Sequence, residues 1–253
     1  MSAIPAARLV ARCRACFACL VCFPFVAATW GAVVAAPMQR DVAYGGEPAE
    51  RYDVYVPAGA GHAPAVFFIH GGAWAHDDEA TPGFLDAKLA RWLPLGYVVT
   101  SVDYPLLPRA HPLEQARDVR CGREGCADSS TGRYVLVDTA ALDVASVMHS
   151  HHARLYDRAF GSVPRRWPEQ SPLALLSGKG PPILAVWSTR WRMSCPGARA
   201  FVAKASSFGT AATLVEEDMS RAEINRKFGE PSAYTDAVDA FMRGCVTEAA
   251  PMR

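Results

Sequence analysis

Five residues, His70-Gly71-Gly72-Ala73-Trp74, follow an uncharged apolar run at residues 65–69 (AVFFI). Glycine has no Cβ, so it lets the backbone turn sharply and approach a ligand closely. A turn of this kind at the end of a strand can direct several N–H groups at one point. Such donors stabilise the negatively charged oxygen that forms during acyl transfer. The candidate oxyanion residues are therefore His70, Gly71, Gly72 and Ala73.

This pentapeptide and the segment YVVTSVDYPLLP at residues 97–108 resemble the α/β-hydrolase superfamily. The similar branch is that of esterases and lipases with an HGGAW motif, which includes BD-FAE proteins, carboxylesterases and kynurenine formamidases. The resemblance covers residues 45–120 and 133–245. It implies an α/β fold, with a mainly parallel sheet flanked by helices. It also implies hydrolysis of a small ester or acyl substrate through an acyl-serine intermediate, without a cofactor or a metal.

The nucleophile that this family carries in a G-x-S-x-G turn is missing from the sequence. The nearest imitation is residues 128–132 (DSSTG), where Asp128 replaces the first glycine and Ser130 is a weak candidate nucleophile. The family needs two helices and a strand between Pro108 and Tyr134, which takes about 40 residues at typical lengths. Only residues 109–133 are present. We therefore expect the elbow strand and its adjacent helix to be absent.

The other two members of a catalytic triad are also not found. The family's acid follows the penultimate strand, here residues 188–195 (STRWRMSC), where Met193 occupies its place. The family's histidine follows the last strand, where Arg221 stands, and no histidine occurs after His152. Arginine stays protonated and cannot act as a general base. We therefore expect impaired catalysis.

A histidine cluster offers a different kind of site. His149, His151 and His152 lie close to Asp157 in the sequence, and these are metal-ligand types. No companion cysteine or carboxylate spacing accompanies them, so a solvated helix or cap segment is favoured and no metal is predicted.

Strand and helix patterns alternate along the chain, as in a parallel sheet covered by helices. The apolar run at 65–69 is typical of a strand buried on both faces. If the elbow strand is absent, this run must pair directly with residues 134–137, or the protein will be marginally stable. The expected strands are residues 51–56, 65–69, 97–102, 134–137, 182–187 and 211–215, and the expected helices are 82–95, 112–120, 196–208 and 233–242.

The N-terminus has the pattern of a targeting segment. Arg8, Arg12 and Arg14 precede an uncharged stretch at residues 15–36, and Val33 and Ala35 suit a cleavage site. We expect residues 1–36 to be a signal peptide of a periplasmic or secreted protein. The stretch is also long enough for an uncleaved membrane anchor. Residues 37–253 would then form one α/β-hydrolase-like domain, shortened around residues 109–133.

Four cysteines remain outside this segment: Cys121, Cys126, Cys195 and Cys245. In an exported protein they permit two disulfides with three possible connectivities. The pairing of nearest neighbours in the sequence joins Cys121 to Cys126 and Cys195 to Cys245, although the sequence cannot choose between the connectivities.

Composition excludes several classes of protein. The 253 residues are 51% apolar and 20% charged, which is a globular balance. The net charge of +1 gives no reason to expect a nucleic-acid partner. Three readings stay open: an exported esterase-type protein with impaired catalysis, a non-catalytic binding protein, and the internally deleted product of an esterase gene.

Overall fold

The first part of the fold is a four-stranded sheet. The computed structural model describes residues 38–59, 63–76, 85–126, 132–139, 141–191 and 195–248. The strands are β1 (Met38–Ala43), β2 (Arg51–Tyr55), β3 (Ala65–Ile69) and β4 (Val98–Val102), in the order β1-β2-β4-β3. The pairs β1–β2 and β2–β4 are antiparallel, and β3 pairs with β4 in parallel.

The second part is a parallel sheet of three strands, β5 (Tyr134–Val137), β6 (Ile183–Ser188) and β7 (Ala212–Glu217), in that order. Every residue of the central strand β6 is buried. Its alternate side chains face opposite layers, since strand side chains have a period of two. Leu184 and Val186 belong to a core cluster with residues of α7 and α8, whereas Ala185 and Trp187 pack with residues of α6.

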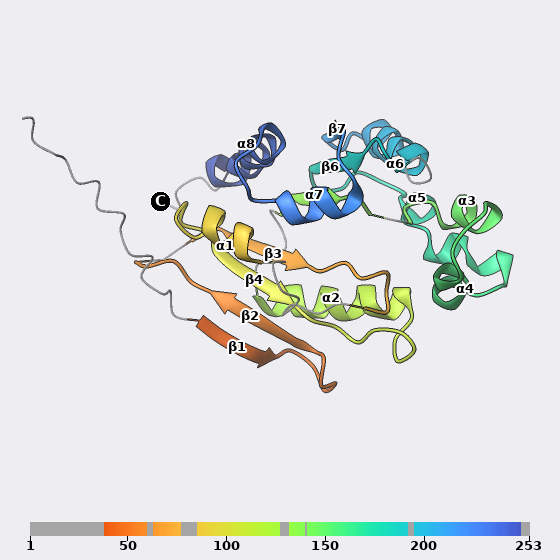
Figure 1. Ribbon diagram of the computed structural model, residues 1–253, viewed down its shortest axis with the longest axis horizontal. Coiled ribbons are helices and arrows are strands. Elements are labelled where there is room, and N and C mark those ends of the chain that lie inside the picture. Colours follow the sequence, from red (N-terminus) through yellow and green to blue (C-terminus); the bar gives the residue numbers. More distant parts are fainter. Residues whose placement is uncertain are drawn as a thin grey trace, which may run out of the picture. The chain divides into compact units, whose positions relative to one another are not determined.

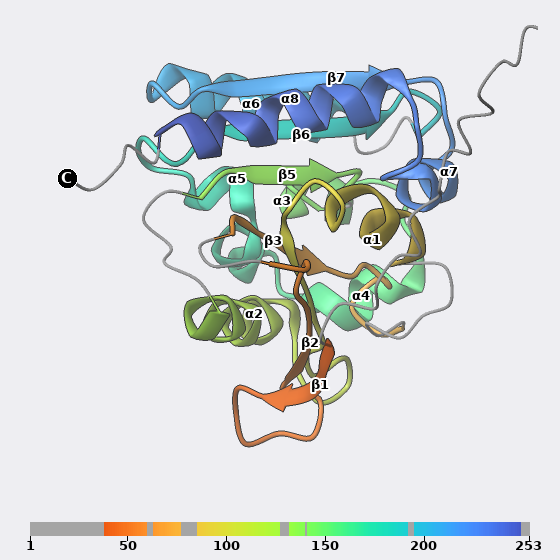
Figure 2. The ribbon, with the colours of Figure 1, turned by 90° about the vertical axis from the view of Figure 1, so that its left-hand side faces the viewer.

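The two sheets do not join. Among the described residues, β3 pairs only with β4 and β5 pairs only with β6. Strands of the first sheet run across the view in Figure 1, whereas those of the second run across the view in Figure 2, which is turned by 90°. The expected direct pairing of residues 65–69 with 134–137 is therefore wrong, because the neighbouring strands cross steeply instead of lying side by side.

This break corrects a second expectation. The strand at 65–69 is not buried on both faces: Phe68 is buried, but Ile69 is 52% exposed. Tyr134 at the start of β5 is 40% exposed. Both strands lie at the edge of a sheet because no described strand occupies the position between them.

Helices, rather than strands, connect the two halves. One core cluster combines Phe68 and Val99 of the first sheet with Leu184 and Val186 of the second. The helices α1 (Asp86–Trp92), α7 (Arg221–Lys227) and α8 (Ala233–Glu248) supply the side chains between them: Trp92, Ile224, Tyr234, Val238 and Met242. In α7, Ser220 and Glu223 form a capping box that fixes where the helix begins.

The remaining helices follow the sequence order. Helix α2 (Pro112–Cys126) follows β4 and extends beyond its predicted end at residue 120. Helix α6 (Cys195–Ser207) lies between β6 and β7 and matches its prediction within one residue. Between β5 and β6, short helices that the sequence analysis did not separate form one block: α3 (Val144–His149), α4 (Arg154–Phe160), η2 (Pro164–Arg166), η3 (Pro168–Gln170) and α5 (Pro172–Leu175).

The cysteine pairing expected from sequence proximity is wrong in this structure, because Cys121 and Cys195 are free thiols. Cys121 and Cys126 both lie in α2, and five residues advance a helix by about 7.5 Å, beyond the reach of a disulfide. In the described part of the chain, no helix is both long and apolar enough to span a membrane. The segment 1–36 lies outside that part.

Candidate functional site

The turn after β3 has an unusual backbone. Gly72 has φ 101°, Ala73 has φ 54° and Trp74 has φ 64°. Positive φ costs an alanine or tryptophan about 1–3 kcal/mol, so the surrounding structure must hold this conformation. The carbonyl oxygen of Gly72 accepts from the N–H groups of Ala75 and His76, at 3.1 and 2.9 Å. No described residue accepts a hydrogen bond from the N–H groups of Gly72 and Ala73.

His70 holds the start of this turn. It is 3% exposed, and its Nε2 lies 3.3 Å from Oδ1 of Asp103. Its ring stacks on Tyr104, with centroids 4.5 Å apart, and the hydroxyl of Tyr104 donates to the carbonyl oxygen of His70 at 2.8 Å. His70 is thus buried, and both its ring and its backbone carbonyl are held by hydrogen bonds. It positions the turn.

Trp74 holds the other end. Its carbonyl oxygen accepts from the backbone N–H of Leu107 at 2.8 Å and from Nε2 of Gln115 at 3.0 Å. Its ring packs edge-on against Tyr156 and Phe160 of α4, at 5.6 and 4.9 Å between centroids. The segment after β4, helix α2 and helix α4 therefore together stabilise the strained backbone.

A second group of side chains lies at the carboxyl ends of β5 and β6 and at the start of α7. Asp138, directly after β5, is fully buried and has φ 46°. Its Oδ1 accepts from the N–H of Ser188 at 3.2 Å, whereas no partner lies at Oδ2 within the described residues. Burial raises the pKa of Asp138, and the hydrogen bond from Ser188 and the charge of Arg221 counteract the rise.

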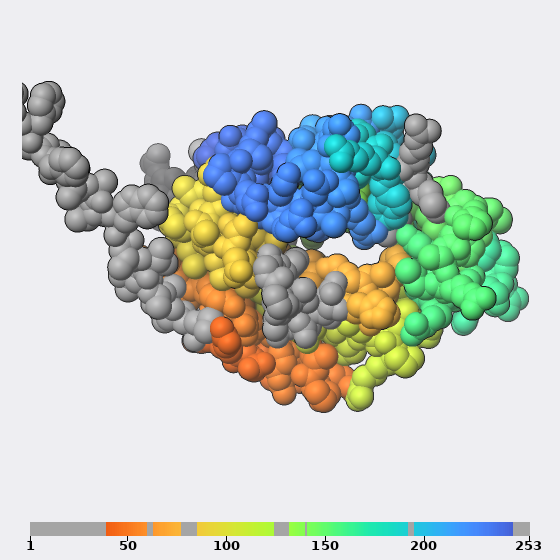
Figure 3. All heavy atoms as spheres, in the orientation of Figure 1, coloured from red at the N-terminus to blue at the C-terminus, as the bar shows by residue number. Residues whose placement is uncertain are grey.

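Aromatic side chains connect this group to the turn. The guanidinium of Arg221 lies over the ring of Trp191, with Cζ 4.4 Å from the centroid. Trp191 and Trp74 pack against the same core cluster, which includes Tyr156 and Phe160. Figure 3 shows an opening between the light-orange residues that end β3 and the blue residues of α7. The turn and Arg221 therefore belong to one region of the surface.

The structure places only part of the expected catalytic set. Ser130 and Met193 lie outside the described residues. The described residues between the end of β6 and α6, including Arg190 and Trp191, contain no carboxylate. Arg221 is the first residue of α7. Sequence reasoning missed Asp138, although its place directly after a predicted strand was the available signal, since functional groups gather at carboxyl strand ends.

The histidines of α3 and the following loop serve other contacts. His149 hydrogen-bonds the carbonyl oxygen of Ala145 at 2.8 Å, and His152 lies 3.1 Å from Asp157. The hydrogen bond that His152 donates to the Asp157 carboxylate raises the pKa of His152. Within the described ranges, no three histidine, cysteine or carboxylate side chains are grouped as a metal would require.

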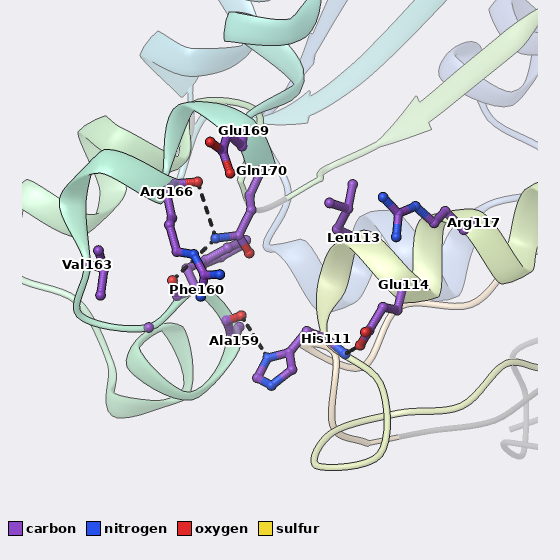
Figure 4. Close-up of a pocket in the computed structure, with 11 residues that line it drawn as sticks. His111, Leu113, Glu114, Arg117, Ala159, Phe160, Val163, Arg166, Glu169 and Gln170 are labelled. Atoms are coloured by element: carbon purple, nitrogen blue, oxygen red, sulfur yellow. Dashed lines mark hydrogen bonds between the residues drawn. The ribbon is translucent and has the colours of Figure 1, made fainter.

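A separate groove of about 290 Å³ lies between the start of α2 and the α4–η3 region (Figure 4). Its charged side chains carry both signs, with Glu114 and Glu169 beside Arg117 and Arg166. Phe160 lines this groove and also packs on Trp74, so the groove backs onto the residue that holds the oxyanion turn. Its balanced charges select no class of ligand.

Comparisons with known proteins agree with this geometry. Residues 52–124 match the BD-FAE family model. The chain is similar to a probable isoprenylcysteine alpha-carbonyl methylesterase, ICMEL2, of Arabidopsis thaliana (29% identical over 109 residues, 43% of this chain and 25% of that protein). It is also similar to Esterase LipC of Mycobacterium tuberculosis (38% identical over 74 residues, 28% of this chain and 17% of that protein). Each match thus spans a quarter or less of the relative's length.

Among solved structures, esterase B from Lactobacillus rhamnosis has the same fold, with a TM-score of 0.63 and 14% identity over 85% of this chain and 87% of that one. A truncated carbohydrate esterase from gut microbiota also has this fold, with a TM-score of 0.62 and 13% identity. The match covers 85% of this chain and 98% of that one. The fold likeness covers both sheets, whereas the family match covers the oxyanion turn and the strands around it. The chain therefore has an α/β-hydrolase fold, and its residues 52–124 are similar to the esterase branch of that fold.

Proposed function

We propose that this protein binds small ester or acyl compounds at the oxyanion turn and does not complete serine ester hydrolysis. The observation that carries the proposal is that the N–H groups of Gly72 and Ala73 have no acceptor among the described residues, while Arg221 begins α7, where the family resemblance leads us to expect the histidine. The N–H groups can polarise a carbonyl oxygen. Arg221 cannot accept a proton, so it cannot activate a serine or a water.

Small esters are proposed as ligands because the relatives named above are esterases by their names. Oxyanion stabilisation alone supplies neither nucleophile nor base. Its effect on a bound ester would be to hold and orient the carbonyl group. The protein would then act as a binding protein.

The test is hydrolysis of p-nitrophenyl acetate and butyrate by the purified protein, with an active esterase of the same fold as a positive control. We expect rates equal to those of buffer. Saturable turnover that Ser130→Ala abolishes would contradict the proposal, because Ser130 would then be the nucleophile. Turnover that survives both Ser130→Ala and loss of the oxyanion turn in a Gly72→Val variant would identify a contaminating esterase.

A second candidate is that the chain is the internally deleted product of an esterase gene. The break between β3 and β5 favours it, since these strands flank the place that residues 109–133 are too few to fill. Resequencing the gene across these codons decides the matter. If resequencing finds an additional in-frame segment with a G-x-S-x-G motif, the first proposal is wrong. If it confirms the short sequence, the first proposal is supported.

We further propose that residues 1–36 direct export. The test is expression of the full chain in a Gram-negative host, followed by fractionation and N-terminal sequencing. A periplasmic product that begins near residue 36 supports a cleaved signal peptide. Intact protein in the membrane fraction would support the anchor instead, and intact protein in the cytoplasm would contradict export.

A further inference from the structure

Arg221 differs from neighbouring arginines in its partners. Arg190 pairs with Asp218 at 2.8 Å, and Arg199 pairs with Glu216 at 2.6 Å. The guanidinium of Arg221 instead lies on the ring of Trp191, and no described carboxylate comes within 4.0 Å of it. Stacking holds a guanidinium by its face and leaves the N–H groups at its edge available for a planar acceptor.

The oxyanion turn supplies further donors in the same region. The N–H groups of Gly72 and Ala73 have no acceptor among the described residues. Trp74 contacts Tyr156. Trp191, on whose ring Arg221 stacks, packs against the same cluster. Burial raises the pKa of Tyr156 and the charge of Arg221 lowers it, which agrees with their closeness. Backbone N–H groups and a positive charge that face the same ligand can together bind an anion.

We infer that Arg221 and the oxyanion turn bind a small monocarboxylate, with its apolar part against the aromatic side chains of this region. The inference rests on the proposed function and names its ligand class. A carboxylate matches the guanidinium because both are planar and can form two parallel hydrogen bonds. The aromatic rings of Trp74, Tyr156 and Trp191 provide the apolar surface beside these charges.

Asp138 is one described acidic group whose charge would oppose a bound anion. It is fully buried, so it does not contact a ligand, but its charge acts on the same guanidinium. Removing that charge should strengthen binding of a carboxylate. This gives the inference two variants with opposite expected effects, since Arg221→Gln should weaken binding and Asp138→Asn should tighten it.

The experiment is titration of the purified protein with benzoate, and with uncharged benzamide as the matched ligand, followed by tryptophan fluorescence and calorimetry. We expect benzoate to bind and benzamide to bind at least about tenfold more weakly. Arg221→Gln should lose about tenfold in affinity for benzoate, Arg221→Lys should lose less, and Asp138→Asn should gain several-fold. The matched control is Arg226→Gln, which removes an exposed arginine from the same helix and should change nothing.

Equal affinities for benzoate and benzamide would overturn the inference, and so would undiminished benzoate binding by Arg221→Gln. Absence of benzoate binding by a protein with a cooperative melting transition would overturn it as well. These outcomes are separate from those of the ester assay. Ester turnover would refute the proposed function, and benzoate binding that depends on Arg221 would then be seen as competitive inhibition.

Discussion

The hydroxyl of Tyr104 donates to the carbonyl oxygen of His70 over 2.8 Å, while the two rings stack with their planes 13° apart. Tyr104→Phe keeps the stacked ring and removes the donor, leaving a buried carbonyl without this partner. We expect the free energy of unfolding to fall by about 1–3 kcal/mol, as measured by urea denaturation. Tyr134→Phe is the control, since Tyr134 is 40% exposed, and an equal loss there would contradict the interpretation.

Lys88 makes stability depend on pH. Burial lowers its pKa from 10.5 to about 8, against a smaller opposite effect of Asp86. Between these pH values the unfolded chain binds the proton more readily, so the free energy of unfolding rises with pH. Below pH 8, burial of the charged amine costs about 3 kcal/mol. Lys88→Met should therefore stabilise the protein at pH 7. It should also reduce the increase in the free energy of unfolding between pH 8 and 10.

The measurement is urea denaturation of both proteins at several pH values, compared as a difference. Burial also raises the pKa of Tyr44 and Tyr234, and this effect is common to both proteins. Lys227→Met, which alters a lysine that is 42% exposed, is the control. A variant that is less stable than the parent at pH 7 would show that the hydrogen bond from Nζ to the carbonyl of Asn225, at 3.3 Å, outweighs the burial of charge.

One edge of β3 pairs with no strand among the described residues, which predicts self-association. Uncharged apolar strands with an unprotected edge pair with other chains. Ile69→Lys should reduce concentration-dependent light scattering, because a lysine at the edge opposes pairing. The matched control is Leu95→Lys, since Leu95 is also 52% exposed but lies outside any strand. Equal improvement in both variants would attribute the effect to net charge rather than to the edge.

The two described thiols should react at different rates. Cys121 is exposed, whereas Cys195 is partly buried and donates to Oε1 of Glu216 at 3.4 Å. Burial and this hydrogen bond raise the pKa of Cys195, so less of it is the reactive thiolate near neutral pH. Iodoacetamide labelling followed by mass spectrometry should find Cys121 modified first. Glu216→Gln should reduce the difference in labelling rate between Cys121 and Cys195. A native protein in which neither thiol reacts would contradict the free-thiol assignment.

The sequence predicted elements whose pattern is local. The strand at 134–137 and helix α6 were foreseen because apolar periodicity and terminal glycines are visible in a short window. The edge position of β3 was not foreseen, because residues 65–69 have the composition of a central strand. In the described part of the chain, no strand pairs with β3 on its other side, and Ile69 is exposed. The short helices between β5 and β6 were also missed, because each is too short to show a periodicity.

The candidate site, like the fold, could be predicted from the sequence only in part. The oxyanion turn could be located from two glycines after an apolar run. The strained φ angles at Ala73 and Trp74 could not be predicted from the sequence. Residues distant in the sequence, such as Gln115 and Tyr156, impose them. The burial of Asp138 likewise depends on β6, which begins more than forty residues later.

The absence of a ladder between β3 and β5 has a mechanical consequence. The two half-sheets can separate while every strand-to-strand hydrogen bond stays intact. What is lost is the side-chain packing around α1, α7 and α8 and the polar contacts of α1 with these helices, such as those of Arg91 and Trp92 with Asp239. Each half would then be its own cooperative unit of local unfolding. Amide hydrogen exchange should show two protection levels, one for β4 and one for β6. A ligand that touches both the turn after β3 and Arg221 would bridge the halves and bring these levels together.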